Sequence, residues 1–171
     1  LLKAQGAGRV VVACKAPLRR LFDSLPDVDF CAEVATGEVS VPRCDVWVFS
    51  MSLPARLGVS LANLPATQPY LAVDVALREK FSAALGDLPT TNRRIGLMWR
   101  GSTEHPNDRY RSLPGGAVLN PLARADLSFV DLHRESPVGG LPDFPCLPLG
   151  RSVEDFAEAG ALIEGLDLVI T

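Results

Sequence analysis

Short apolar runs rich in β-branched residues alternate with amphipathic stretches, and this alternation constrains the fold more than any other feature of the chain. Residues 9–15 read Arg-Val-Val-Val-Ala-Cys-Lys, with an uninterrupted apolar middle. A run of this kind is typical of a strand buried on both faces of a parallel sheet. Pro17 then opens a stretch with the apolar spacing of one helix face, at Leu18, Leu21, Phe22 and Leu25. The sequence therefore predicts the start of a βαβ layer in an α/β protein.

The same reading, applied along the chain, predicts several further elements. Parallel strands are expected at residues 9–15, 45–50, 94–99, 127–132 and 166–171, and a short one at 28–34. Helices are expected at 17–25, 54–57, 74–85 and 152–164, with a weak one at 115–125 and a Pro/Gly loop over 134–150. Asp74 is the expected cap of the third helix, and Ser152 with Asp155 resembles a capping box at the start of the fourth.

The best linker candidate follows the helix at 74–85. Residues 86–93 combine a helix-ending glycine, a proline and polar residues without an apolar period. We therefore expect two α/β modules, 1–88 and 94–171, joined by a linker at 89–93. A single doubly wound domain is the alternative, and chain length alone favours it. Because residues 1–6 read as the end of a helix and residues 166–171 as a strand without a following turn, both ends are expected to be truncated.

Charge and hydropathy exclude several functional classes. The chain carries 17 Lys and Arg against 20 Asp and Glu, a net charge of −3 that repels polyanions and argues against nucleic-acid binding. The sequence has neither an apolar run of about eighteen residues nor the charged start and apolar stretch of a signal peptide. We therefore expect a cytoplasmic protein without a membrane span.

The cysteines and glycines exclude further chemistry. The spacing of Cys14, Cys31, Cys44 and Cys146 fits no zinc motif, so we expect free thiols in a reducing compartment and no metal or other cofactor. The pair Gly6 and Gly8 precedes its strand instead of following it, and a phosphate-binding P-loop is missing from the sequence. A G-x-S-x-G elbow is missing as well, which argues against a serine hydrolase.

One loop collects the residues that could carry chemistry. Residues 99–114 follow a predicted buried strand, and ligands of open α/β sheets bind beyond the carboxyl ends of the strands. This loop holds three arginines and a histidine, which are donors suited to phosphate oxygens. Gly101 would let the backbone pass close to a ligand. The alternative is a solvated loop whose arginines pair with Glu104 and Asp108.

The motif in this loop carries a family resemblance. Residues 95–101 (Ile-Gly-Leu-Met-Trp-Arg-Gly), His105, 107–114 (Asn-Asp-Arg-Tyr-Arg-Ser-Leu-Pro), 161–163 and 166–171 resemble the glycosyltransferase region found behind tetratricopeptide repeats in many bacterial proteins. That region is similar to the O-linked N-acetylglucosamine transferases and to the lipopolysaccharide heptosyltransferases. Residues 51–54 and 69–71 more weakly resemble the acceptor-side lobe of the same family.

The resemblance implies a GT-B architecture, in which two Rossmann-like lobes face each other. Residues 1–88 would form the late part of the N-terminal, acceptor-side lobe, and residues 94–171 the first half of the C-terminal, donor-side lobe. The parent protein would transfer a sugar from a nucleotide-sugar to an unknown protein or glycan acceptor, by direct displacement without a metal. This chain ends before the rest of the donor site, so it is expected to be inactive by itself.

The resemblance also assigns roles within the loop. Arg111, Arg109, Ser112 and Gly101 would bind the donor phosphates, and His105 would assist proton transfer. Asp108 and Glu104 would shape the loop. Arg111 would offset the charge of the leaving diphosphate. The alternative function is a non-catalytic α/β module in which the same loop binds an anion or a partner.

Three further expectations concern residues outside this loop. Trp47 and Trp99 lie on predicted strands and are expected in the core. His133, at the end of a predicted strand, is expected to be a satisfied structural residue. The last strand is expected to have a bare apolar edge that promotes self-association.

Overall fold

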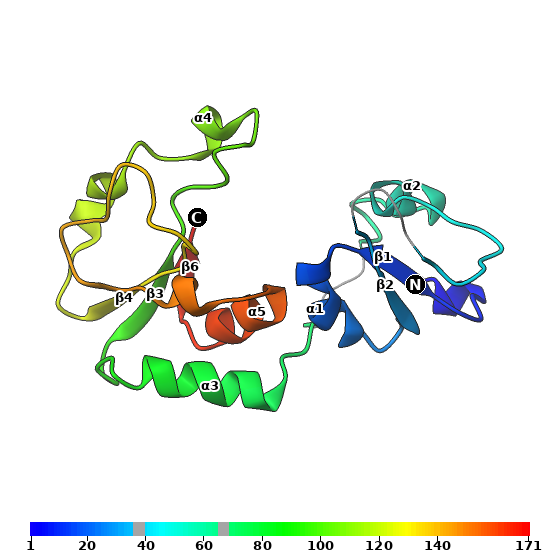
Figure 1. Ribbon diagram of the computed structural model, residues 1–171, viewed down its shortest axis with the longest axis horizontal. Coiled ribbons are helices and arrows are strands. Elements are labelled where there is room, and N and C mark those ends of the chain that lie inside the picture. Colours follow the sequence, from blue (N-terminus) through cyan, green and yellow to red (C-terminus); the bar gives the residue numbers. More distant parts are fainter. Residues whose placement is uncertain (36–39, 65–68) are drawn as a thin grey trace. The chain divides into compact units, whose positions relative to one another are not determined.

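The computed structural model describes residues 1–35, 40–64 and 69–171. The chain divides into two compact units, Leu1–Ala72 and Val73–Thr171 (Figure 1). Each unit contains a parallel sheet, so the chain belongs to the α/β class expected from the sequence.

The first unit is built on a two-stranded parallel sheet. Strand β1 (Val11–Cys14) pairs with β2 (Phe30–Glu33), and the connection between them contains a 3-10 turn and helix α1 (Arg19–Asp23). These elements confirm the predicted strands at 9–15 and 28–34 and the helix predicted between them at 17–25. Among the residues of this unit that the structure describes, the buried apolar ones are Cys14, Cys31 and Ala32.

The strand predicted at 45–50 does not form. This segment is irregular and pairs with no described strand, and Val46, Trp47 and Phe49 are 86, 78 and 71% exposed. The expected core position of Trp47 is therefore wrong: its ring packs edge-on against Phe49, with 5.2 Å between centroids, and stays in solvent. An apolar run becomes a buried strand only when neighbouring elements cover it. After this segment comes α2 (Leu53–Arg56), where a short helix was predicted.

The second unit contains a four-stranded parallel sheet. Its strands are β3 (Arg93–Leu97), β4 (Leu127–Asp131), β5 (Cys146–Leu147) and β6 (Leu168–Ile170), in the order β5-β4-β3-β6. This is the strand order of half a doubly wound, Rossmann-like sheet. The strands predicted at 94–99, 127–132 and 166–171 are confirmed, whereas β5 lies in the stretch predicted as a loop. β6 pairs with β3 on one side and with no described strand on the other.

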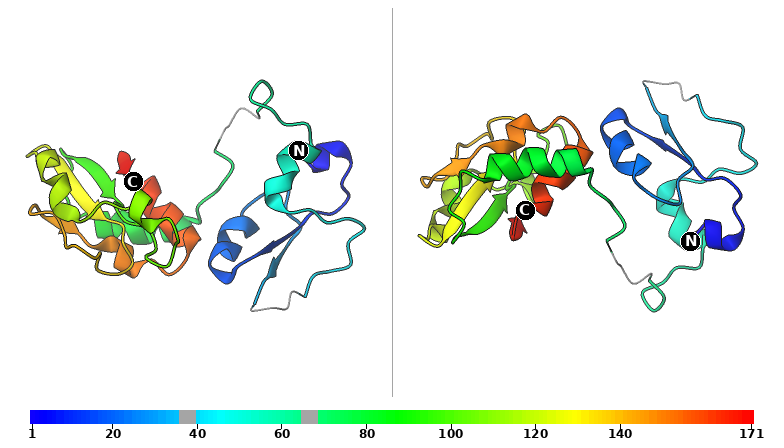
Figure 2. Two further views of the ribbon diagram at one scale, coloured as in Figure 1. Left: turned by 90° about the horizontal axis from the view of Figure 1, so that it is seen from above. Right: turned by 90° about the horizontal axis from the view of Figure 1, so that it is seen from below.

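Helices α3 (Val75–Leu85) and α5 (Phe156–Glu164) pack side by side on one face of this sheet (Figure 2). The Asp74 carboxylate caps α3, as predicted, by accepting a hydrogen bond from the Ala76 amide at 2.8 Å. The cap of α5 is Asp155, and a 3-10 turn occupies residues 149–152, so the helix starts later than predicted. The cluster buried here is Phe81, Leu85, Val130, Val153, Ala161 and Leu162.

A 3-10 helix (Gly116–Leu122) contributes to the core on the opposite face. It replaces the weak helix predicted at 115–125, and Pro121 within it has no N–H to continue an α-helical ladder. The second buried cluster comprises Ile95, Leu97, Trp99, Leu119 and Phe129. The core position predicted for Trp99 is thus confirmed. The sheet is covered on both faces, which explains why the middle of its central strands is apolar, at Ile95, Leu97, Phe129 and Val130.

The boundary between the units lies before α3, not after it. α3 buries Phe81 and Leu85 in the core of the second unit, so residues 86–92 form a turn inside that unit instead of a linker between two units. In the described residues we find no helix that is long and apolar enough to span a membrane.

Candidate functional site

The arginine-rich loop starts at the end of the central strand β3. Successive strands β3, β4 and β5 extend the sheet to one side, and β6 returns to the other side of β3. The order therefore reverses between β3 and β6, which is where open α/β sheets bind their ligands. The Met98 amide donates to the Ile170 carbonyl at 2.9 Å, so the loop leaves the sheet at this point. Figure 1 shows α4 (Asp108–Arg111) at the same end of the sheet as the C-terminus.

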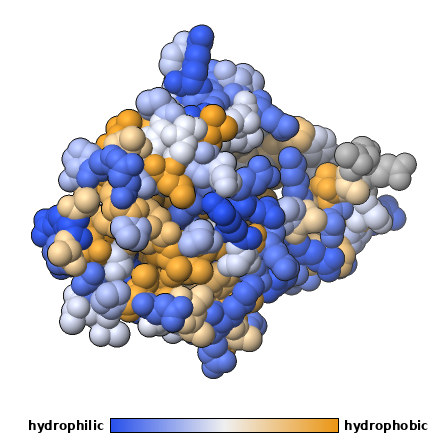
Figure 3. Space-filling view, turned by 60° about the vertical axis from the view of Figure 1, so that its left-hand side comes forward, coloured by the Kyte–Doolittle hydropathy of each residue, from blue (hydrophilic) through white to orange (hydrophobic). Residues whose placement is uncertain are grey.

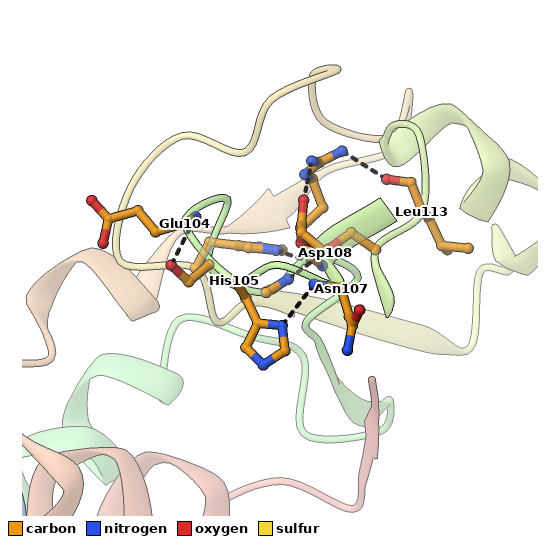
Figure 4. A network of polar contacts seen from close by, with 10 residues as sticks. Glu104, His105, Asn107, Asp108 and Leu113 are labelled. Atoms are coloured by element: carbon orange, nitrogen blue, oxygen red, sulfur yellow. Dashed lines mark hydrogen bonds and ion pairs between the residues drawn. The ribbon is translucent and has the colours of Figure 1, made fainter. Parts of the chain in front are cut away.

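Arg100 holds the two ends of the loop together. Its guanidinium donates to the Leu113 carbonyl at 2.9 Å and to the Asp108 carboxylate at 3.2 Å (Figure 4). The Leu113 amide in turn donates to the Trp99 carbonyl at 2.9 Å. The side chains of Arg100 and Asp108 are each only 15% exposed, so this ion pair is better shielded than a surface pair. Arg100 is consequently a structural residue of the loop.

Gly101, Asp108 and Ser112 form a second set of hydrogen bonds that holds the two ends of the loop together. The Ser112 hydroxyl accepts the Gly101 N–H at 3.0 Å and donates its own proton to Asp108. Asp108 thus makes the loop-shaping contacts assigned to it. The Ser112 proton is already used, which leaves this hydroxyl unable to donate to a phosphate in the same arrangement.

Arg111 is the guanidinium left available by these contacts. It is exposed and has no hydrogen bond or ion pair with the residues that the structure describes. A Cβ added to Gly101 would lie 4.0 Å from Arg111 Nη2 and 3.9 Å from Asp108 Oδ1, so the absent side chain leaves the backbone open beside Arg111. Arg109 instead stacks its guanidinium over the Tyr110 ring, 4.5 Å from the centroid.

His105 and Glu104 lie on the exposed outer part of the loop. His105 Nδ1 accepts the Asn107 N–H at 3.1 Å, so in the neutral ring the proton is on Nε2. In this form His105 offers a donor and not a base. The Glu104 amide donates to the Ser102 hydroxyl at 3.3 Å, while its carboxylate points away from the network in Figure 4.

A buried polar pair at the end of β4 was not among the predicted site residues. Asp131 Oδ1 accepts the His133 amide at 3.0 Å and lies 2.6 Å from His133 Nδ1. Both residues are buried, and His133 is hydrogen-bonded as expected for a structural histidine. The signal available in the sequence was Asp-x-His, which places both side chains on one face of a strand.

The buried thiols and the acidic side chains offer no second reactive centre. Burial raises the pKa of Cys31 to about 12 and that of Cys146 to about 11, so both thiols are protonated at neutral pH. Across residues 1–35, 40–64 and 69–171, His, Cys, Asp and Glu nowhere form a group of three suited to a metal ion.

Two hollows lie at the opposite end of the sheet from this loop. One, of about 660 Å³, is lined by residues around the amino end of β4, including Leu88, Leu127, Phe129 and Phe144. The other, of about 500 Å³, lies beside Arg93, Arg94 and Asp167. Apolar groups also reach the surface in patches between hydrophilic ones (Figure 3). Neither hollow coincides with the ligand-binding end of a parallel sheet.

The structure thus brings together Gly101, Asp108, Arg111 and Ser112, and leaves His105, Arg109 and Glu104 on the outer surface of the loop. Comparison of the chain with protein-family models, curated proteins and solved structures finds no match. Its function is therefore inferred from the geometry of the loop and of the sheet that carries it.

Proposed function

We propose that the second unit binds the diphosphate of a nucleotide-sugar at the loop after β3, as the donor side of a GT-B glycosyltransferase. The observation that carries the proposal is the exposed guanidinium of Arg111, which has no hydrogen-bond or ion-pair partner among the described residues. Arg111 lies on a loop whose ends are held together by hydrogen bonds, and this loop follows β3 at the point where the strand order reverses. A planar guanidinium can donate two parallel hydrogen bonds to phosphate oxygens.

The surroundings of Arg111 support an anionic ligand. Gly101 leaves room beside the Arg111 guanidinium. Asp108, the nearest carboxylate in the network, is bound to Arg100 and Ser112, so its charge is already partly neutralised. In sugar transfer Arg111 would offset the negative charge that develops on the leaving diphosphate. The motif's resemblance to glycosyltransferases supplies the reaction class.

Transfer by this chain alone is not part of the proposal. His105 holds the donor tautomer, and Asp108 is engaged by two partners, so neither is placed to take a proton from an acceptor hydroxyl. We expect the chain to bind nucleotide-sugar without turning it over. We also propose a cytoplasmic location, which the four free cysteines support because thiols stay reduced in that compartment.

The same observation favours a second candidate, a non-catalytic anion-binding module. The two functions differ in whether a bond is broken in the intact protein. Release of nucleoside diphosphate from a nucleotide-sugar, coupled to labelling of an acceptor, supports the enzyme. Binding of a nucleotide-sugar without release of nucleoside diphosphate supports the module.

The test is calorimetric titration of the chain with a nucleoside diphosphate. Arg111→Ala should weaken binding by about 1.5–3 kcal/mol, the range for a hydrogen bond to a charged group. Arg111→Lys should recover only part, because an ammonium keeps the charge and loses the two-pronged geometry. Arg109→Ala is the matched control: it removes the same charge two residues away, from a side chain stacked on Tyr110, and should have a smaller effect.

Two results would refute the assignment. Arg111→Ala that binds as tightly as wild type, with an unchanged melting temperature, would show that the loop is not the diphosphate site. Equal losses in Arg111→Ala and Arg109→Ala would indicate general electrostatic attraction instead of recognition by one side chain.

A further inference from the structure

The buried pair at the end of β4 reaches the arginine loop through the backbone. The Arg100 amide donates to His133 Nε2 at 3.3 Å, and His133 Nδ1 lies 2.6 Å from Asp131 Oδ1. In the neutral ring only one nitrogen carries a proton. Asp131 favours that proton on Nδ1, which leaves Nε2 as the acceptor that the Arg100 amide requires.

We propose that Asp131 and His133 are positioning residues that hold the start of the anion-binding loop, with Asp131 setting the tautomer and His133 anchoring the Arg100 backbone. The inference rests on the proposed diphosphate site. Arg100 transmits the anchor, because its guanidinium binds Leu113 and Asp108, which in turn binds Ser112. Arg111 lies between Asp108 and Ser112 in the chain, so its position depends on the contacts that these two residues make.

A catalytic role for the pair does not fit the geometry. His133 is 6% exposed and both ring nitrogens have partners within the fold, so neither faces a ligand in solvent. The ring also packs edge-on against Trp99, with 4.2 Å between centroids. A general base needs a nitrogen within reach of the proton that it removes.

A role in packing alone does not explain the pair either. Asp131 is fully buried and lies opposite Leu97 in the register of β3 and β4. A carboxylate at such a position costs free energy that an apolar side chain would avoid, unless it is hydrogen-bonded. Oδ1 accepts two hydrogen bonds from His133, from the amide and from the ring, whereas the buried Oδ2 has no hydrogen-bond partner among the described residues, so the hydrogen bonds shown for this carboxylate all go to His133.

The experiment uses the whole chain and two substitutions of His133. His133→Phe keeps an aromatic ring beside Trp99 but removes the acceptor for the Arg100 amide. His133→Gln supplies an amide oxygen near the position of Nε2 and restores the acceptor. Ser128→Ala is the control, because it removes a buried polar group at the other end of β4, where Ser128 binds Asn92. Melting temperatures identify any variant that fails to fold.

Hydrogen exchange and nitrogen-15 spectra report on the anchor itself, and titration with inorganic pyrophosphate reports on the ligand site. Hydrogen exchange of the Arg100 amide should become about tenfold faster in His133→Phe, while His133→Gln and Ser128→Ala stay within about twofold of wild type. Titration with inorganic pyrophosphate should show about five- to tenfold weaker binding for His133→Phe alone. Nitrogen-15 spectra of wild type should show Nδ1 protonated and Nε2 unprotonated.

Each result has a definite meaning. Unchanged Arg100 exchange in folded His133→Phe, or a ring protonated on Nε2, overturns the anchor. Faster exchange with unchanged pyrophosphate affinity also overturns the proposal, because the anchor then does not position the anion site. If wild type binds no pyrophosphate, the proposed function itself fails, and exchange shows whether the anchor exists without it. If folded His133→Gln shows the same fast Arg100 exchange and weak pyrophosphate binding as His133→Phe, the acceptor is not what His133 contributes.

Discussion

The two units share a parallel strand pair and differ in how much apolar surface they bury. In each unit a strand, β1 or β3, is joined through a short helical segment to a parallel partner strand, β2 or β4. The second unit adds strands on both sides of β3 and β4 and covers both faces, which buries two apolar clusters. Among the described residues of the first unit, the buried apolar ones are Cys14, Cys31 and Ala32. A pair of parallel strands alone therefore buries few apolar residues, and an extensive core requires further strands and helices that cover the sheet.

The two tryptophans illustrate this difference. Trp47 lies within an apolar run and Trp99 just after one, and both were predicted to be buried. Trp99 is 4% exposed because residues from β4 and the 3-10 helix pack around it, whereas Trp47 is 78% exposed. Local hydrophobicity is similar in the two cases, and only tertiary neighbours separate them.

The largest expected effect is a difference between two Phe→Ala substitutions. Phe81 in α3 is 1% exposed, so Phe81→Ala should lower the free energy of unfolding of the second unit by about 3–5 kcal/mol. Phe30 in β2 is 39% exposed, so Phe30→Ala should cost less than about 1 kcal/mol. Urea unfolding followed by circular dichroism measures both. Equal costs would mean that the first unit has a core as extensive as the second.

The next effect concerns self-association, which both units could cause. β6 presents an edge with no described partner strand, and Leu168 on it is 52% exposed. A lysine on an edge strand opposes pairing between copies, so Leu168→Lys should weaken a dimer about tenfold in sedimentation equilibrium. Trp47→Ser is the matched change in the first unit. If only Trp47→Ser reduces association, the exposed segment at 45–51 and not the β6 edge is responsible.

Most strands of the fold could be predicted because they are long apolar runs. β3, β4 and β6 each follow a polar turn and have an apolar middle, although β4 also buries Ser128 and Asp131. β5 was missed because it has two residues between Pro145 and Pro148, too few for any period. The domain boundary was misplaced because Gly86 and Pro89 mark a turn equally well within a unit as between units. The packing of α3 on α5 assigns α3, and the turn after it, to the second unit.

The candidate site was predictable as a loop and less so as a set of contacts. Charge and position after β3 identify residues 99–114, and Asp108 was correctly expected to interact within the loop. The sequence does not reveal that the Arg100 guanidinium is bound by Asp108 and Leu113 while that of Arg111 is not. All three arginines of the loop lie within a few residues of the same acidic side chains, so the sequence does not tell which of them forms the pair. The contact from Arg100 to His133 joins residues 33 positions apart and depends on the strand register.

A smaller effect is expected at the boundary that the sequence misplaced. Asp74→Ala removes the acceptor for the Ala76 amide at the start of α3 and should cost about 1 kcal/mol of stability. Asp74→Asn keeps an acceptor and should cost much less. Because α3 belongs to the second unit, the loss should appear in the transition that Phe81→Ala also shifts. A shift of only the first unit's transition would place the boundary after α3, as the sequence predicted.

Ionisation of the thiols of the first unit is expected to have no effect on stability at neutral pH, and its effect appears only in alkali. Burial raises the pKa of Cys31 from 9.0 to about 12, so the folded unit retains this proton more tightly than the unfolded chain does. The associated stabilisation is complete below pH 9 and is lost as the pH rises from 9 towards 12.

The measurement is alkylation with iodoacetamide followed by mass spectrometry, with the exposed Cys44 as internal control. At neutral pH we expect Cys44 to react at least about tenfold faster than Cys31, because the thiolate is the nucleophile and Cys31 is 2% exposed. The difference should narrow above pH 9 and vanish in urea. Equal alkylation rates of Cys31 and Cys44 in the native protein at neutral pH would mean that the two-stranded sheet does not protect its buried residues from solvent. The difference in core stability between the two units would then be larger than the burial of Cys31 implies.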